Sequence, residues 1–155
     1  MNLQHRRNSR APDKRSPTPN HTRSCERLTE VARHDQVQLQ LPGAPEYGRV
    51  ARIAAAHLAL RRGFSLNEID DLRLVIDEAV VMLLGPGLPT GRLDITYSVE
   101  GDEVGVDARV LSDPDIPLPV DRMDRFAELV GELVDSYDID PATYRIRLSK
   151  RKAAV

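Results

Sequence analysis

The sequence predicts an α+β fold, a two-layer sandwich in which a mixed four-stranded sheet is covered on one face by three helices. Apolar residues alternate with polar ones in four stretches, which is typical of strands with one buried face. They recur every three or four residues in three other stretches, which is typical of amphipathic helices. The predicted order is strand, helix, helix, strand, strand, helix, strand, and such bunching of helices argues against a doubly wound sheet.

The composition fits one folded domain. The chain has 155 residues, a net charge of -2 and 41% hydrophobic residues, which is too apolar for a wholly disordered protein. Its one cysteine excludes an internal disulfide and a cysteine-based zinc site. No uncharged apolar stretch approaches the roughly 18 to 20 residues of a membrane helix, so we expect a cytoplasmic protein with no membrane partner.

Residues 1–34 are predicted to be a disordered basic tail. The first 24 residues hold six basic residues against one acidic residue, with three prolines and few aliphatic side chains. They lack the apolar core of a secretory signal, so we do not expect export. No aromatic residue or motif accompanies the charge, and we therefore favour a solvated extension over contact with nucleic acid.

The domain that follows, residues 35–149, is predicted to open with a strand and a helix. Val37, Leu39 and Leu41 alternate with glutamines, and Pro42 ends this strand. A helix is expected over 46–62, and the expected apolar face consists of Tyr47, Val50, Ile53, Ala54, His57 and Leu58. We expect the imidazole of His57 to be packed on that face rather than catalytic. The exposed face would be basic, with Arg49, Arg52 and Arg61.

A second helix should begin after Ser65, because Ser65 and Glu68 have the spacing of a capping box. It should end near Leu84, before a Gly-Pro-Gly sequence. The helix is apolar nearly all round, which indicates burial on more than one side. Its predicted core face consists of Ile69, Leu72, Ile76, Ala79, Val80 and Leu83.

The second half of the chain predicts a hairpin, a helix and a closing strand. The hairpin strands are expected over 93–99 and 104–110, joined by a tight turn. The third helix is expected over 121–137 and the closing strand over 144–148. Residues 150–155 are predicted to be a basic C-terminal tail.

One acidic residue stands out in the search for chemistry. The sequence holds no GxxxxGK[ST] loop, no Gly-rich strand-to-helix fingerprint and no nucleophile elbow. In the second helix, however, Asp77 and Glu78 interrupt an apolar run, and carboxylates are seldom buried without a partner. Glu78 therefore faces either a cleft or open solvent, and Met82 lies one turn further on.

Three phrases of the sequence resemble a known family. They are LRLVIDEAVVMLL at 72–84, PEYGRVARIAAAHLA at 45–59 and GFSLNEIDD at 63–71. Together they resemble the anti-sigma factor serine-protein kinases of bacterial sporulation and stress response. The resemblance covers residues 35–149 and implies the Bergerat (GHKL) ATPase fold.

The resemblance also implies roles for single residues. Glu78 stands at the family's general base, in a vestigial role if the site is lost. Met82 stands where the family has a magnesium-binding asparagine, and a soft thioether is a poor ligand for that hard ion. Asp113 is a weak candidate for the adenine contact, because it is out of frame and is followed by proline. The glycines that wrap the triphosphate have no counterpart, so we expect no cofactor and no metal.

The partners implied by the resemblance are a sigma factor and an anti-anti-sigma factor. Arg49 and Arg52 on the first helix are the candidate partner-binding residues, and their alternative reading is a pair of solvated helix charges. The family also suggests a homodimer through a sheet edge. The leading hypothesis is an anti-sigma-type regulator with a degenerate ATP site. The alternative is an active kinase that phosphorylates an anti-anti-sigma factor, and only this alternative requires ATP and Mg²⁺.

Overall fold

The computed structural model describes residues 35–88, 91–112 and 117–154. The predicted tail at 1–34 and the adenine candidate Asp113 lie outside these residues. Within them, the principal elements run along the chain as β1 Asp35–Pro42, α1 Gly48–Arg61, α2 Leu66–Leu84, β2 Arg92–Glu100, β3 Glu103–Leu111, α3 Val120–Val130, β4 Ser136–Asp140 and β5 Arg145–Arg151. Single 3-10 turns precede α1, at Pro45–Tyr47, and follow α3, at Gly131–Leu133.

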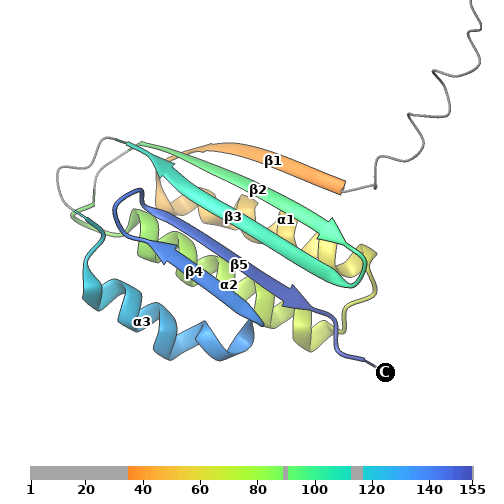
Figure 1. Cartoon of the computed structure of the whole chain (residues 1–155). Coiled ribbons are helices and arrows are strands. Elements are labelled where there is room, and N and C mark those ends of the chain that lie inside the picture. The colour runs from red at the N-terminus through yellow and green to blue at the C-terminus, as the bar shows by residue number, and fades with distance from the viewer. Residues whose placement is uncertain (1–34, 89–90, 113–116, 155) are drawn as a thin grey trace, which may run out of the picture. The chain divides into compact units, whose positions relative to one another are not determined.

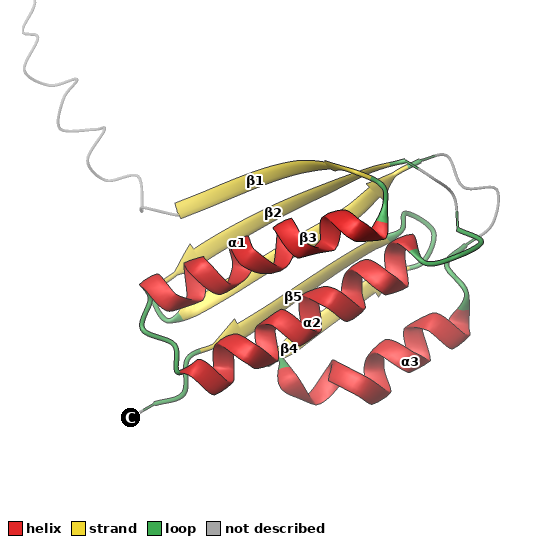
Figure 2. Cartoon of the chain, turned by 180° about the vertical axis from the view of Figure 1, so that it is seen from behind, coloured by secondary structure: helices red, strands yellow, loops and turns green. Residues whose placement is uncertain are grey.

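The predicted α+β sandwich is confirmed, but its sheet has five strands rather than four and is antiparallel rather than mixed. The strand order across the sheet is β1-β2-β3-β5-β4, and all neighbouring strands are antiparallel. The three helices cover one face of the sheet, with α2 between α1 and α3 (Figures 1 and 2). The other face carries charged side chains joined in ion pairs, such as Arg145 with Asp107 and Arg151 with Glu103.

The core lies between the sheet and the helices. The alternation predicted for the hairpin is confirmed, because the alternating apolar residues at 93–99 and 104–110 are buried. Tyr97 of β2 is fully buried beneath α1, and its hydroxyl donates a hydrogen bond of 2.7 Å to the carbonyl of Ala51. The six residues predicted for the core face of α2 are all buried.

The start of α2 follows the sequence prediction. The Ser65 hydroxyl accepts a hydrogen bond from the Glu68 amide, and the Glu68 carboxylate accepts one from the Ser65 amide. This reciprocal capping box satisfies two backbone donors that a helix end leaves free.

The prediction for the buried face of α1 was wrong for most of its residues, although Ala54 and Leu58 are partly buried against the core. Alanines at positions 51, 55 and 59 lie against the sheet with no exposed surface. Other predicted residues point outward: Ile53 is 61% exposed, Val50 is 44% exposed, and Tyr47 and His57 are exposed as well. The small inward residues leave room for Tyr97, whose hydroxyl reaches the α1 backbone.

The predicted third helix was too long at its C-terminal end. Helix α3 ends at Val130, and residues 136–140 form β4 at the edge of the sheet. Tyr137 of β4 packs against Phe126 of α3 with ring centroids 5.4 Å apart. Tyr137 thus packs on the same apolar surface as Phe126, but from a different element. Its spacing from Leu133 in the sequence therefore resembled that of a continued helix.

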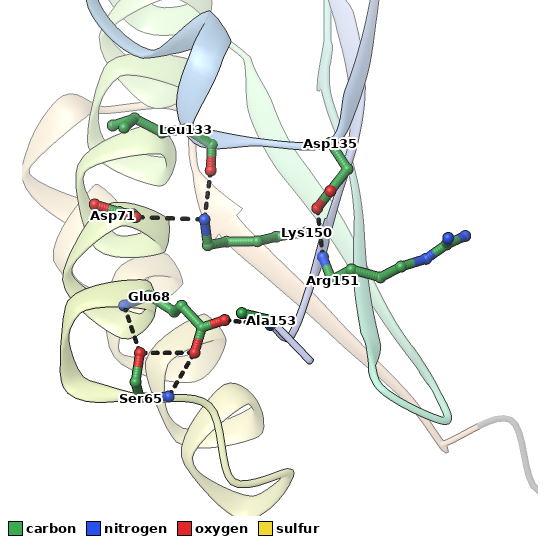
Figure 3. A network of polar contacts seen from close by, with 8 residues as sticks. All are labelled: Ser65, Glu68, Asp71, Leu133, Asp135, Lys150, Arg151 and Ala153. Atoms are coloured by element: carbon green, nitrogen blue, oxygen red, sulfur yellow. Dashed lines mark hydrogen bonds and ion pairs between the residues drawn. The ribbon is translucent and has the colours of Figure 1, made fainter. Parts of the chain in front are cut away.

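The predicted basic tail at 150–155 begins inside a strand, because β5 continues through Arg151. Lys150 is buried, and its ammonium donates to the carbonyl of Leu133 at 2.6 Å and pairs with Asp71 at 3.4 Å. The Ala153 amide donates to Glu68 at 2.6 Å (Figure 3). These contacts join the end of the sheet to the start of α2.

Candidate functional site

Helix α2 presents Glu78 and Met82 on the side that faces α3. The two residues are one helical turn apart, so their side chains are neighbours. Met82 is only 3% exposed, whereas the side chain of Glu78 keeps 18% of its surface exposed. The sequence left Glu78 facing either a cleft or open solvent, and the structure supports the cleft.

This cleft, the α2–α3 pocket, has a volume of about 310 Å³. Its lining combines an apolar floor with charged residues from both helices: Glu78, Val81, Met82, Pro86, Asp121, Arg122, Arg125 and Phe126. The volume is at the lower end of the range for small-molecule sites.

Two arginines of α3 occupy the charged side of the pocket. Arg125 places its Nε 3.7 Å from the Glu78 carboxylate, and its side chain remains 64% exposed. Arg122 donates from Nη2 to the Pro86 carbonyl at 2.6 Å and from Nη1 to the Val81 carbonyl at 3.3 Å. Because the last carbonyls of a helix lack partners within it, Arg122 caps the C-terminal end of α2.

Gly85 permits this cap. A Cβ atom at position 85 would lie 1.8 Å from Arg122 Nη1 and 2.7 Å from the Val81 carbonyl oxygen. Any larger residue would displace the guanidinium from the end of α2. The glycine was recognised in the sequence as a helix stop, but its contact with α3 had no sequence signal.

The donor set in the pocket is a poor one for a hard cation. Among the pocket residues, the side-chain oxygen ligands are the carboxylates of Glu78 and Asp121, while Met82 contributes a thioether. Within the described residues, no group of three or more His, Cys, Asp or Glu side chains is placed to hold a metal ion.

The two candidate partner-binding residues lie on α1, away from the α2–α3 pocket. Arg52 of α1 donates from Nη1 to the carboxylate of Asp77 on α2, so its guanidinium links the two helices. Arg49 is exposed on α1. The structure therefore places the arginines and the Glu78–Met82 pair at two separate sites.

A second hollow, which sequence reasoning missed, lies between α1 and α2. It has a volume of about 270 Å³, and its lining is mainly apolar: Ile53, Ala56, His57, Leu60, Leu66, Ile69 and Arg73. We call it the α1–α2 groove. The available signal was the set of alanines that recur every four residues in α1. They form a second apolar stripe that can face the sheet, which turns the larger apolar residues toward this hollow.

No helix in the described part of the chain combines the length and apolar character needed to cross a membrane. No protein-family model matches the chain.

The chain is similar to curated proteins named serine-protein kinase RsbW. The relative from Listeria innocua is 34% identical over 76 residues, which cover 47% of this chain and 48% of that protein. The relative from Oceanobacillus iheyensis is 27% identical over 79 residues, covering 49% and 50% respectively. The relative from Bacillus subtilis is 25% identical over 89 residues, covering 48% and 56%. The chain thus spans about half the length of the curated relatives it matches.

Proposed function

We propose that this protein is an anti-sigma-type regulator that binds a sigma factor, an anti-anti-sigma factor or both, without using ATP. The observation that carries the proposal is the similarity to serine-protein kinases RsbW in a chain that has Met82 one turn after Glu78. The α+β sandwich agrees with the Bergerat-type fold that the sequence phrases imply. We also infer that the folded domain extends from residue 35 through the end of β5 at Arg151, that the protein is cytoplasmic and that the edge of β1 permits a homodimer.

The chemistry around Glu78 supports a lost nucleotide site. Magnesium requires oxygen ligands in near-octahedral arrangement, and the buried thioether of Met82 offers none. Arg125 forms an ion pair with Glu78 at 3.7 Å, which favours the charged carboxylate as a partner of α3. Arg122 fixes α3 to the end of α2. In this pocket α2 offers a metal ion one carboxylate, that of Glu78, beside the thioether of Met82.

Calorimetric titration with ATP and Mg²⁺ tests whether the nucleotide site has been lost. We expect no heat of binding up to millimolar nucleotide, which corresponds to a free energy weaker than about -4 kcal/mol. The Met82→Asn variant restores an oxygen ligand and serves as the matched comparison. Nucleotide binding by the unmodified protein would contradict this part of the proposal.

Partner binding is tested separately with purified proteins. Each sigma factor and anti-anti-sigma factor of the source genome is mixed with the full chain and separated by size-exclusion chromatography. We expect at least one to co-elute with it. If none does at micromolar concentration, the regulator proposal fails.

The alternative function is an active kinase, which the printed name of the relatives favours. In that case Glu78 is the general base, and phosphate transfer from labelled ATP to an anti-anti-sigma factor should disappear in Glu78→Gln. Our proposal predicts no transfer by either protein. Transfer that depends on Glu78 would establish the kinase.

A further inference from the structure

We propose that the α1–α2 groove binds an amphipathic helix of a partner protein, through an apolar stripe flanked by acidic residues. This inference deepens the proposed function, because it names the kind of segment by which the partner is recognised. It rests on the outward face of α1, the shape of the groove and the charge along its rim.

The outward residues of α1 are not needed for the core. Val50, Ile53, His57 and Leu60 follow one another at intervals of three, four and three residues, so they form one stripe along the helix. The stripe is exposed, with Leu60 at 56% and Ile53 at 61%. Leu66 at the start of α2 is 75% exposed. Apolar residues gathered in this way are typical of interaction surfaces.

The groove has the form that receives a helix. A neighbouring hollow, lined by Arg52, Ile53, Arg73, Leu74 and Asp77, shares Ile53 and Arg73 with it, so the two hollows adjoin each other along the helix pair. Helix α1 has 14 residues, which gives a length of about 21 Å. This length matches three to four turns of a bound helix, with anchors spaced at about three and four residues.

The charge along the rim selects an acidic partner. Helix α1 contains three arginines and no acidic residue. Arg73 of α2 stands on the opposite rim. The ion pairs of Arg52 with Asp77 and Arg73 with Asp70 involve exposed or half-exposed side chains, which are weakly coupled in water. Each of these pairs is neutral overall, and Arg49 and Arg61 of α1 form no ion pair among the described residues, so this helix keeps an excess of positive charge in a chain whose net charge is negative.

The same charge argues against two other occupants. A second copy of this face would bring the arginines of both α1 helices together, and like charges at an interface are unfavourable. An anionic lipid surface would also attract the arginines, but it is broad and flat, whereas the apolar side chains line hollows between two helices. A helix can enter these hollows.

The test uses the full chain and two synthetic helical peptides with the same apolar stripe, one flanked by Glu and the other by Lys. Fluorescence anisotropy measures the binding of each. We expect the Glu-flanked peptide to bind at least about tenfold more tightly than the Lys-flanked peptide. Ile53→Glu should weaken the binding of the Glu-flanked peptide by about tenfold or more. Leu129→Glu, a control on α3 at a residue that is 50% exposed, should change its affinity less than about twofold.

Three results would overturn the inference. The first is no binding of the Glu-flanked peptide at millimolar concentration, and the second is equal binding by the Ile53→Glu variant. The third is binding of the chain to phosphatidylserine vesicles that is abolished by Ile53→Glu but not reduced by the Glu-flanked peptide. This result would assign the surface to a membrane.

The purified partners distinguish this inference from the proposed function. If a sigma or anti-anti-sigma factor binds the unmodified chain and Ile53→Glu equally, the function stands and the groove inference fails. If no such partner binds but the Glu-flanked peptide does, the groove stands and the function fails.

Discussion

The two flanks of α2 carry hollows of similar size, about 310 Å³ toward α3 and about 270 Å³ toward α1, yet they are built in different ways. On the α3 flank, Phe126 is buried and Arg122 binds backbone carbonyls, so internal contacts fix the pocket. On the α1 flank, large apolar side chains such as Ile53 stay exposed, and the small residues do the packing. The comparison teaches that apolar character in a helix does not by itself indicate which residues support the fold.

Truncating one apolar residue on each flank should give the largest contrast. Phe126→Ala removes a side chain that is 1% exposed and its ring contact with Tyr137. We expect the free energy of unfolding to fall by about 3–5 kcal/mol. Ile53→Ala, at a residue that is 61% exposed, should change it by less than about 0.5 kcal/mol. Urea denaturation measures both, and a loss of stability in Ile53→Ala comparable with that of Phe126→Ala would refute the contrast.

Enlarging an inward alanine of α1 should also be costly. Ala55 has no exposed surface, so Ala55→Leu forces α1 away from the sheet. We expect a loss of about 1–3 kcal/mol in the free energy of unfolding. His57→Leu, an exposed substitution in the same helix, should be neutral within about 0.5 kcal/mol. Equal melting temperatures for the two variants would show that α1 faces the sheet differently.

The two arginines of α3 should differ in their effect on stability. Arg122→Ala removes hydrogen bonds to the carbonyls of Val81 and Pro86, and we expect a loss of about 1 kcal/mol. Arg125→Ala removes an exposed ion pair at 3.7 Å and should cost less than about 0.5 kcal/mol. Thermal denaturation of both variants measures the difference, and the reverse order would contradict the assignment of Arg122 as the cap.

Another expected effect depends on pH and concerns the end of the groove near Leu66. The Ala153 amide, followed by the hydroxyl and amide of Ser65, lowers the pKa of Glu68 from 4.5 to about 2. Because the pKa is lower in the folded protein, ionised Glu68 stabilises the fold above about pH 4.5, and this contribution is lost as the pH falls toward 2.

Glu68→Gln should therefore reduce the free energy of unfolding at pH 7 by about 1 kcal/mol. The difference from the unmodified protein should narrow between pH 4.5 and pH 2, as measured by urea denaturation across that range. Glu128→Gln, an exposed control on α3, should show no such trend. A difference for Glu68→Gln that stays constant with pH would rule out its ionised contacts as the cause.

Local sequence signals predicted most of the fold. The Ser65–Glu68 capping box, the hairpin alternation and the core face of α2 depend on residues close in sequence, and all three were confirmed. Strand β4 was missed because its Tyr137 has the spacing of a helical residue, although it contacts Phe126 of α3 from a separate element. The burial of Lys150 was missed because its partners, Leu133 and Asp71, come from distant segments.

The candidate site was predictable only in part. The spacing of Glu78 and Met82 followed from helical geometry, but their neighbours Arg122 and Arg125 come from a different helix, far along the chain. The orientation of α1 was not predictable from its period, because both of its faces are apolar. The choice between them depends on the volume that Tyr97 leaves beneath the helix, which is a property of the sheet.

The inverted packing of α1 has a consequence for how such a protein can diverge. Its inward alanines admit few replacements, since a larger side chain would separate the layers. Its outward positions 50, 53 and 60 can exchange one apolar residue for another without a thermodynamic penalty to the fold. Duplicated copies of the gene could therefore acquire new partners through changes on one helix face, while every intermediate along the way remained folded.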